Sequence, residues 1–155
     1  MYKDYYMTMA LSSAKKAMKN DEVPVGAIIV MNDIVIARGY NKKEKYQDPT
    51  LHAEIDVIKK ATRLLKTWNL SGADVYVTLE PCLMCTGALI AARIRRLFFG
   101  AWDSKYGCCG SLLNVSKDVR FNHQFEIEGG IMEIECQKLL TDFFKEKREA
   151  HKCLL

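Results

Sequence analysis

The chain lacks any hydrophobic run long enough to cross a membrane. Its apolar segments stay well below the roughly 18 residues that a membrane-spanning helix needs. The first residues include Asp4 and no uninterrupted apolar core, so a secretory signal is not expected. Internal repeats, low-complexity tracts and linker-like segments are also missing. These absences favour a cytoplasmic protein with no membrane association, made of one domain over residues 1–155 whose core covers about 2–148.

Neither sign of charge dominates the composition. The 23 Lys and Arg residues outnumber the 19 Asp and Glu residues, and the net charge of +4 is compatible with nucleic acid without being diagnostic of it. Cysteine, by contrast, is plentiful, with six residues. In a reducing cytoplasm such cysteines are more often metal ligands or buried thiols than disulfide partners.

Hydrophobic periodicity predicts helices that alternate with strands. Helices are expected over about 2–19, 51–65 and 81–93 and from 132 onward, and strands over 24–31, 34–40, 74–79, 96–100 and 125–128. In the second helix, the residues expected to face inward are Ile55, Ile58, Ala61 and Leu65. Segment 101–123 has no clear period, and long loops of that kind are uncommon unless they are functional. The alternation predicts an α/β protein in three layers, with helices covering a sheet.

Two short motifs place metal-binding side chains at the starts of predicted helices. They are His52-Ala53-Glu54 and Pro81-Cys82-Leu83-Met84-Cys85. Cys82 and Cys85 are three residues apart, so both sulfurs project from one face of a helix. With His52 they form a zinc donor set, and three protein ligands leave the fourth tetrahedral position for water. The spacing therefore predicts a catalytic site with one Zn²⁺ per subunit.

Glu54 is the candidate proton carrier of this site. Two residues apart on a regular helix, His52 and Glu54 would point to nearly opposite sides, so they can share a pocket only on a first turn. We therefore expect Thr50 or Leu51 to begin the helix, with the metal between two helix N-termini. Glu54 would act as general base and then general acid in attack on an amidine-like ring carbon and loss of ammonia. The pattern H-x-E…P-C-x-x-C is the recognised signature of zinc-dependent nucleobase deaminases.

Other interpretations of these residues stay open at this point. His52 could be an ordinary core or surface histidine, with Cys82 and Cys85 as small buried side chains. The zinc could be purely structural, with a fourth ligand from the pair Cys108-Cys109. Glu54 could simply be an acid favoured by the dipole at a helix start. The occurrence of both motifs in order, each at a predicted helix start, favours the catalytic interpretation.

Several further motifs resemble those of the bacterial tRNA-specific adenosine deaminases. They are Glu22-Val23-Pro24-Val25-Gly26-Ala27, Asp48-Pro49-Thr50-Leu51-His52-Ala53-Glu54, Thr78-Leu79-Glu80-Pro81-Cys82-Leu83-Met84-Cys85-Thr86-Gly87-Ala88, Asp103-Ser104-Lys105-Tyr106-Gly107 with Gly110-Ser111, and Asp142-Phe143-Phe144. The loop and the last helix are the specific part, because the two metal motifs alone occur across many deaminases. The resemblance covers most of the chain.

The resemblance carries implications for fold, substrate and site. It implies a cytidine-deaminase-like α/β/α sandwich around a five-stranded mixed sheet, and a homodimer in which both subunits contact RNA. The substrate would be the wobble adenosine of a tRNA anticodon stem-loop, converted to inosine by hydrolytic deamination. Asn41 would bind the flipped base, although a turn residue is the plainer account of it. Asp103 and Lys105 would contact the anticodon unless they only stabilise their loop, with Ser104 and Phe144 as weaker candidates.

Two rival functions remain. A deaminase of a free base or nucleotide, of the guanine or cytosine type, would share the metal motifs. A non-catalytic RNA-binding subunit that keeps zinc for stability would share them too, but it would not need Glu54. Basic residues that could track phosphates are Lys42, Lys43, Lys45, Arg93, Lys145, Lys147 and Arg148.

Overall fold

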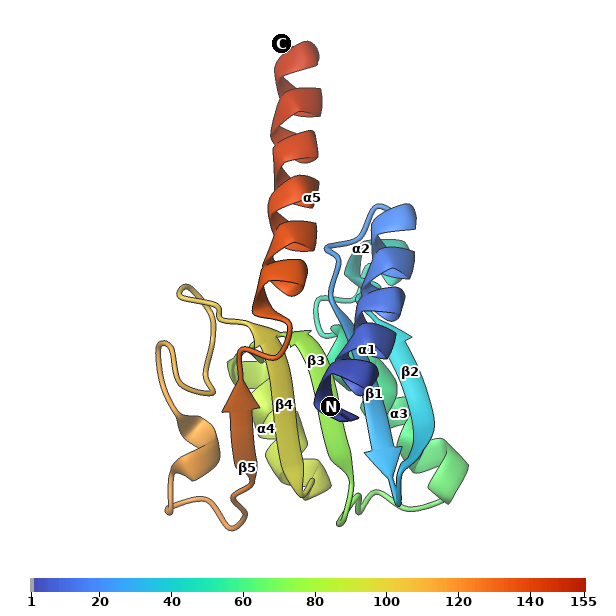
Figure 1. The fold of residues 1–155 in the computed structure, drawn as a ribbon, viewed down its shortest axis with the longest axis vertical. Helices are drawn as coiled ribbons and strands as arrows, with labels where there is room; N and C mark the ends of the chain where they lie inside the picture. Colours follow the sequence, from blue (N-terminus) through green and yellow to red (C-terminus); the bar gives the residue numbers. More distant parts are fainter. Residues whose placement is uncertain (1) are drawn as a thin grey trace.

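The structure, a computed structural model, describes residues 2–155 as a sheet with helices on both faces (Figure 1). The elements are α1 (Tyr2–Lys19), β1 (Gly26–Met31), β2 (Ile34–Tyr40), α2 (Lys43–Tyr46), α3 (Ala53–Leu65), β3 (Asp74–Leu79), α4 (Leu83–Ala92), β4 (Arg96–Ala101), the 3₁₀ helix η1 (Val115–Lys117), β5 (Glu126–Gly129) and α5 (Glu133–Cys153). Within this described part of the chain, no helix combines the length and the apolar character that a bilayer crossing requires.

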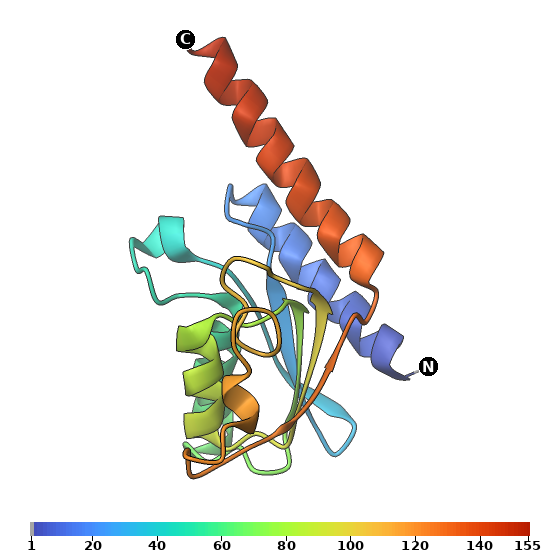
Figure 2. The same cartoon turned by 90° about the vertical axis from the view of Figure 1, so that its left-hand side faces the viewer.

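The sheet is mixed, with the strand order β2-β1-β3-β4-β5. Strand β1 pairs antiparallel with both β2 and β3, whereas β3, β4 and β5 are parallel. Helices α1 and α5 lie on one face, and α3 and α4 lie on the other (Figure 2). The predicted three-layer α/β/α sandwich with a five-stranded mixed sheet is confirmed.

Close packing of α1 on β1 explains why the first strand begins at a glycine. A Cβ on Gly26 would lie 2.1 Å from the carbonyl oxygen of Ala10 and 2.3 Å from the amide nitrogen of Ala14. The strand then continues with residues that are buried as far as Val30, as expected for a strand covered on both faces. The sheet and helices together bury one connected apolar core.

The predicted element boundaries need several corrections. The second helix starts at Ala53 rather than at Thr50 or Leu51, and the helix expected from residue 81 starts at Leu83. The short elements α2 and η1 were not predicted, because four and three residues are too few to show a period. On α3 the prediction for Leu65 is wrong, since 36% of it is exposed, while Ala53, Val57 and Ala61 form the fully buried stripe.

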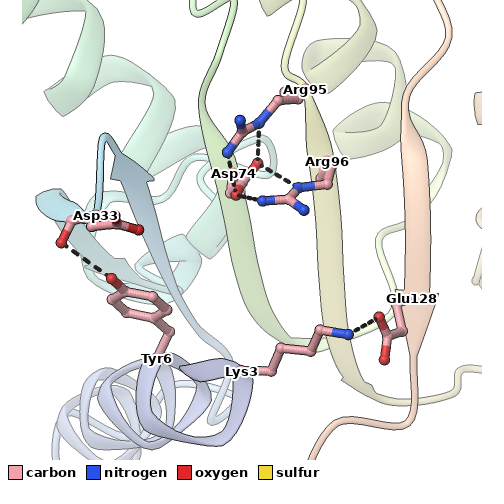
Figure 3. A network of polar contacts seen from close by, with 7 residues as sticks. All are labelled: Lys3, Tyr6, Asp33, Asp74, Arg95, Arg96 and Glu128. Atoms are coloured by element: carbon pink, nitrogen blue, oxygen red, sulfur yellow. Dashed lines mark hydrogen bonds and ion pairs between the residues drawn. The ribbon is translucent and has the colours of Figure 1, made fainter. Parts of the chain in front are cut away.

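The two ends of β3 are each fixed by a buried carboxylate. At the first residue, Asp74 accepts four hydrogen bonds from the guanidinium groups of Arg95 and Arg96, at 2.6 to 3.1 Å (Figure 3). Bidentate pairs of this kind give a defined geometry as well as attraction. Just beyond the last residue, Glu80 is 2% exposed. Cys82, one of the predicted metal ligands, follows Glu80 by two residues.

Candidate metal site and active site

The side chains of the candidate metal site come from the starts of α3 and α4. His52 is the N-cap of α3, with φ −76° and ψ 164°, and Cys82 is the N-cap of α4, with φ −72° and ψ 177°. Both residues are extended rather than helical, so their side chains turn out from the helix mouths instead of along the helix face. This shared geometry brings Cys85 and His52 together across the two helices.

The donor atoms are spaced as a tetrahedral zinc ion requires. The Nδ1 atom of His52 lies 3.6 Å from the sulfur of Cys82 and 3.5 Å from the sulfur of Cys85, and the three ligand atoms lie within 4.8 Å of one another. From the usual zinc–sulfur and zinc–nitrogen bond lengths, a sulfur and a nitrogen on one zinc ion should be about 3.6 Å apart. The residues present therefore fit the metal that the motifs predict.

Cys108 and Cys109 do not complete a tetrad. Among the described residues, the metal-binding group contains only His52, Cys82 and Cys85. The sulfur of Cys109 contacts the hydroxyl of Thr86 at 3.3 Å, and the thiol of Cys108 points to the carbonyl of Tyr106. Burial raises the pKa of both thiols, that of Cys109 to about 12, which keeps them protonated. A three-ligand site leaves one coordination position open.

In the metal-free site, the three candidate ligands differ in how strongly they hold a proton. A hydrogen bond from the Cys85 thiol lowers the pKa of Cys82 to about 4. The same bond raises the pKa of Cys85, which keeps the proton. The pKa of His52 is also raised, first by its hydrogen bond with Cys82. One thiolate thus faces a ring that tends to hold a proton, and a metal ion would displace protons from Cys85 and His52.

Glu54 lies beside the three candidate ligands, and its side chain is buried. Its side chain is 4% exposed, and this burial raises the pKa of its carboxyl to about 7, against smaller opposing effects of a backbone N–H group and of His52. A group whose pKa lies near the working pH is suited both to accept and to return a proton. As the second residue of α3, Glu54 shares the pocket with His52 because both lie at the helix mouth, as the sequence predicts.

Asn41 directly follows β2. It is 7% exposed, and its side-chain amide has no hydrogen-bond partner among the described residues, yet its polar atoms still reach the surface. Its own backbone N–H donates to the carbonyl of Val25 at 3.1 Å. A nearly buried amide without a partner is available to a ligand.

Two buried carboxylates hold this segment from either side. Glu22 accepts the backbone N–H groups of Glu44 and Lys45, at 3.2 and 2.7 Å. Asp56 accepts the backbone N–H of Tyr40 at 3.2 Å and the ammonium group of Lys42 at 2.9 Å. Burial acts to lower the pKa of Lys42, but the hydrogen bond to Asp56 and the negative charge of Asp56 act in the opposite direction, and the pKa is raised overall. Lys42 is therefore bound internally rather than presented to phosphates.

The predicted RNA-contacting residues of the loop lie at its surface. Ser104 and Lys105 are exposed, and Asp103 is half-buried. One carboxylate oxygen of Asp103 accepts the backbone N–H groups of Lys105 and Tyr106, at 3.0 and 3.1 Å. Asp103 thus stabilises its loop, and its second oxygen takes part in neither of these bonds. The structure places this loop next to the segment that carries Cys82, through a hydrogen bond from the Cys108 N–H to the Pro81 carbonyl.

Phe144 lies in a different layer of the molecule. It belongs to α5, which packs on β3, β4 and α1, on the face opposite to the helices that carry the metal residues. The ring is 43% exposed and meets Phe143 edge-on, with centroids 5.4 Å apart. The far half of α5 stands clear of the sheet (Figure 1). The structure therefore does not bring Phe144 to the metal site within this chain.

Sequence reasoning missed the three buried carboxylates of Glu22, Asp56 and Glu80. Each accepts hydrogen bonds from backbone amides of a segment that borders the site. A signal was present, because Glu80 directly follows an apolar strand and Glu22 stands two residues before the predicted start of another. A charged side chain there is buried only when it is paired or hydrogen-bonded.

Comparisons with known proteins agree on one family. Residues 1–148 match the family described as MafB19-like deaminases. A tRNA-specific adenosine deaminase of Bacillus subtilis (strain 168) is 47% identical over 149 residues, which cover 96% of this chain and 92% of the relative. A solved structure from a study of A-to-I editing by tRNA:A34 deaminases at the wobble position of transfer RNA has a TM-score of 0.85 and 43% identity, covering 88% of this chain and 99% of that one. A guanine deaminase from Nitrosomonas europaea, at 22% identity and a TM-score of 0.80 over 90% of this chain and 83% of that one, shares the fold.

The fold and the arrangement of the site define a deaminase of the cytidine-deaminase-like class. Such an enzyme is a hydrolase that acts on carbon–nitrogen bonds. The chain belongs to the MafB19-like deaminases and, within them, to the family of the tRNA-specific adenosine deaminases.

Proposed function

We propose that this protein converts the wobble adenosine of a tRNA anticodon to inosine by hydrolytic deamination. The observation that carries the proposal is a dry carboxylate, Glu54, beside a three-ligand group with the spacing of a zinc site. Membership of the tRNA-specific adenosine deaminase family supplies the substrate class. A cytoplasmic location follows from the proposed substrate.

In the proposed site, His52, Cys82 and Cys85 hold one zinc ion. When bound, such an ion acts as a Lewis acid that makes a water molecule nucleophilic near neutral pH. Glu54 would take one proton from that water and give it to a ring nitrogen. It would then take the second proton, from the hydroxyl group now bonded to the ring carbon, and give it to the departing amine, which leaves as ammonia. In the metal-free protein, burial raises the pKa of the Glu54 carboxyl to about 7. The buried position of Glu54 also keeps bulk water from competing for this proton.

Asn41 and the loop from Asp103 to Lys105 would hold the substrate. The unpaired amide of Asn41 can donate to and accept from the edge of a base turned out of the anticodon loop. A single-stranded loop lowers the cost of turning that base out. The exposed side chains of Ser104 and Lys105 are placed to meet neighbouring nucleotides.

A homodimer is supported by the surface of α4. This helix contains no charged residue, and its outer face exposes Leu83 (58%), Gly87 and Ala91, which are spaced four residues apart. A helix that is apolar on all sides is normally buried on all sides. We propose that a second copy of the chain covers this face. In a dimer, Phe144 of one subunit could contact RNA bound at the site of the other. The variant Ala91→Glu should then sediment as a monomer, whereas the unchanged protein should sediment as a dimer.

The decisive test uses an anticodon stem-loop with adenosine at the wobble position. Purified protein should form inosine in this RNA, and it should not deaminate free adenosine, guanine or cytosine. The variant Glu54→Gln should lose activity while it retains about one zinc ion per chain. Turnover of free guanine or cytosine without turnover of the stem-loop would replace this proposal by the rival one. Activity retained by Glu54→Gln would show that another group moves the proton.

A further inference from the structure

Glu80 is a buried carboxylate to which the proposed chemistry gives no part. It follows β3 directly and stands two residues before Cys82. Its two oxygens accept four hydrogen bonds, and all four donors belong to residues 103–111. They are the backbone N–H groups of Asp103 (3.1 Å), Cys109 (3.1 Å) and Ser111 (3.0 Å) and the hydroxyl of Ser111. A single side chain therefore binds three residues of one loop.

The packing of Gly107 shows how closely the loop wraps this carboxylate. A Cβ on Gly107 would lie 2.3 Å from the Cδ and Oε2 atoms of Glu80, so no other residue fits there without a shift. The neighbouring Cys108 donates its backbone N–H to the carbonyl of Pro81 at 2.9 Å. Both contacts join the loop to the short stretch that leads from the strand to Cys82.

We propose that Glu80 is a positioning residue, which fixes the 103–111 loop relative to the metal site so that the loop binds RNA without first having to become ordered. The inference rests on the proposed function, because that function makes Asp103, Ser104 and Lys105 contacts of the anticodon. A segment without helix or strand loses much conformational entropy when it is ordered, and ordering it before binding improves affinity. Loss of the Glu80 contacts should therefore raise KM for the RNA, while the bound base still meets an intact reaction centre.

The chain offers a matched control in Asp74. This residue is also a buried carboxylate with four hydrogen bonds, and it lies at the opposite end of the same strand (Figure 3). The six residues of β3 separate the two groups by roughly 20 Å at the usual rise per residue. Asp74→Asn thus weakens the same strand without touching the loop.

The experiment compares Glu80→Gln, Ser111→Ala and Asp74→Asn in the full-length, zinc-loaded protein. A Gln amide keeps one acceptor oxygen and turns N–H donors toward backbone N–H groups, so it retains at most half of the bonds to the loop. For Glu80→Gln we expect KM for the stem-loop to rise about tenfold and kcat to change less than about threefold. Ser111→Ala removes one of the four donors, so it should shift KM in the same direction by a smaller factor. Asp74→Asn should leave KM unchanged.

Amide hydrogen exchange tests the same proposal without any substrate. In Glu80→Gln the backbone N–H groups of residues 103–111 should exchange at least about tenfold faster, and in Asp74→Asn they should not. Unchanged exchange in this loop would overturn the proposal. A fall in both kcat and metal content of Glu80→Gln at constant KM would also overturn it, because Glu80 would then be part of the metal site. An equal rise of KM in Asp74→Asn would overturn it as well. If Glu80→Gln does not fold, Ser111→Ala decides by the same two measurements.

The two proposals can fail separately. If the unchanged protein forms no inosine in the stem-loop, the proposed function is wrong, and the exchange data still decide whether Glu80 orders the loop. If inosine is formed and Glu80→Gln keeps its KM and its slow exchange, only the role of Glu80 is wrong.

Discussion

Replacing Glu54 by Gln should make the metal-free protein more stable and should slow catalysis strongly in the zinc-loaded enzyme. Burial raises the pKa of this carboxyl from 4.5 to about 7. Because each pKa unit corresponds to about 1.4 kcal/mol, the fold disfavours the ionised form by on the order of 3 kcal/mol. Gln is of similar size and carries no charge, so it removes this cost.

The gain in stability should depend on pH in a defined direction. Between pH 4.5 and about 7 the folded protein keeps a proton on Glu54 that the unfolded chain has released, so stability falls as pH rises through this window. Below the window the variant and the unchanged protein should unfold at similar free energies. Above it, the variant should be more stable by on the order of 3 kcal/mol.

Urea unfolding in the presence of a chelator, followed by circular dichroism at pH 5 and pH 8, measures this difference. Glu149→Gln, which changes an exposed acid on α5, is the control and should shift stability by less than about 0.5 kcal/mol at both pH values. A Glu54→Gln effect of equal size at pH 5 and pH 8 would refute the assignment of a buried, proton-holding carboxyl. In the zinc-loaded enzyme the same substitution should reduce kcat by a factor of about 10² to 10⁴.

Three further predictions concern the metal, the base and the core. Zinc binding should release protons, because the raised pKa values of Cys85 and His52 keep protons on the metal-free site. Calorimetry at neutral pH in buffers of different ionisation enthalpy measures the number released, and no release would contradict this reasoning. Asn41→Ala should lower kcat/KM for the stem-loop about 10-fold to 100-fold. Its free energy of unfolding should change by less than about 1 kcal/mol, because no hydrogen bond within the protein is lost. A large loss of stability in urea would indicate a structural role instead. Gly26→Ala should cost about 3 kcal/mol or more in urea unfolding, since its methyl group would meet the backbone of α1; a cost below about 1 kcal/mol would mean that α1 is loosely packed.

The candidate metal residues could be predicted because their geometry depends on local spacing. Two cysteines three residues apart, and a histidine at another helix start, are recognisable wherever they occur. What the sequence pattern did not show is that His52 and Cys82 are both N-caps, so that each helix begins one residue after its first ligand. The expected helix starts were placed two residues too early for this reason, because the N-cap conformation depends on ψ angles that periodicity does not reveal.

The contacts of Glu80 could not be predicted, because they carry no sequence signature. Its partners lie 23 to 31 residues further along the chain, and three of the four donors are backbone N–H groups, which every residue except proline possesses. Side-chain patterns indicate burial and periodicity. Even burial is predicted wrongly near the end of a helix, as for Leu65, which was expected to be buried and is 36% exposed. Long-range bonds to the main chain therefore become visible only in the folded molecule.

Because Glu80 grips mainly the main chain of its loop, the outward side chains between Asp103 and Gly107 are not needed for the loop's path. If this loop contacts RNA as proposed, exchanging the exposed residues Ser104, Lys105 and Tyr106 as a set should change which nucleic acid is preferred. The metal residues and Glu54 would remain unchanged in each such variant. Under the proposed function, the loop that selects the RNA is thus separate from the site that reacts, and Glu80 holds the two in a fixed relative position.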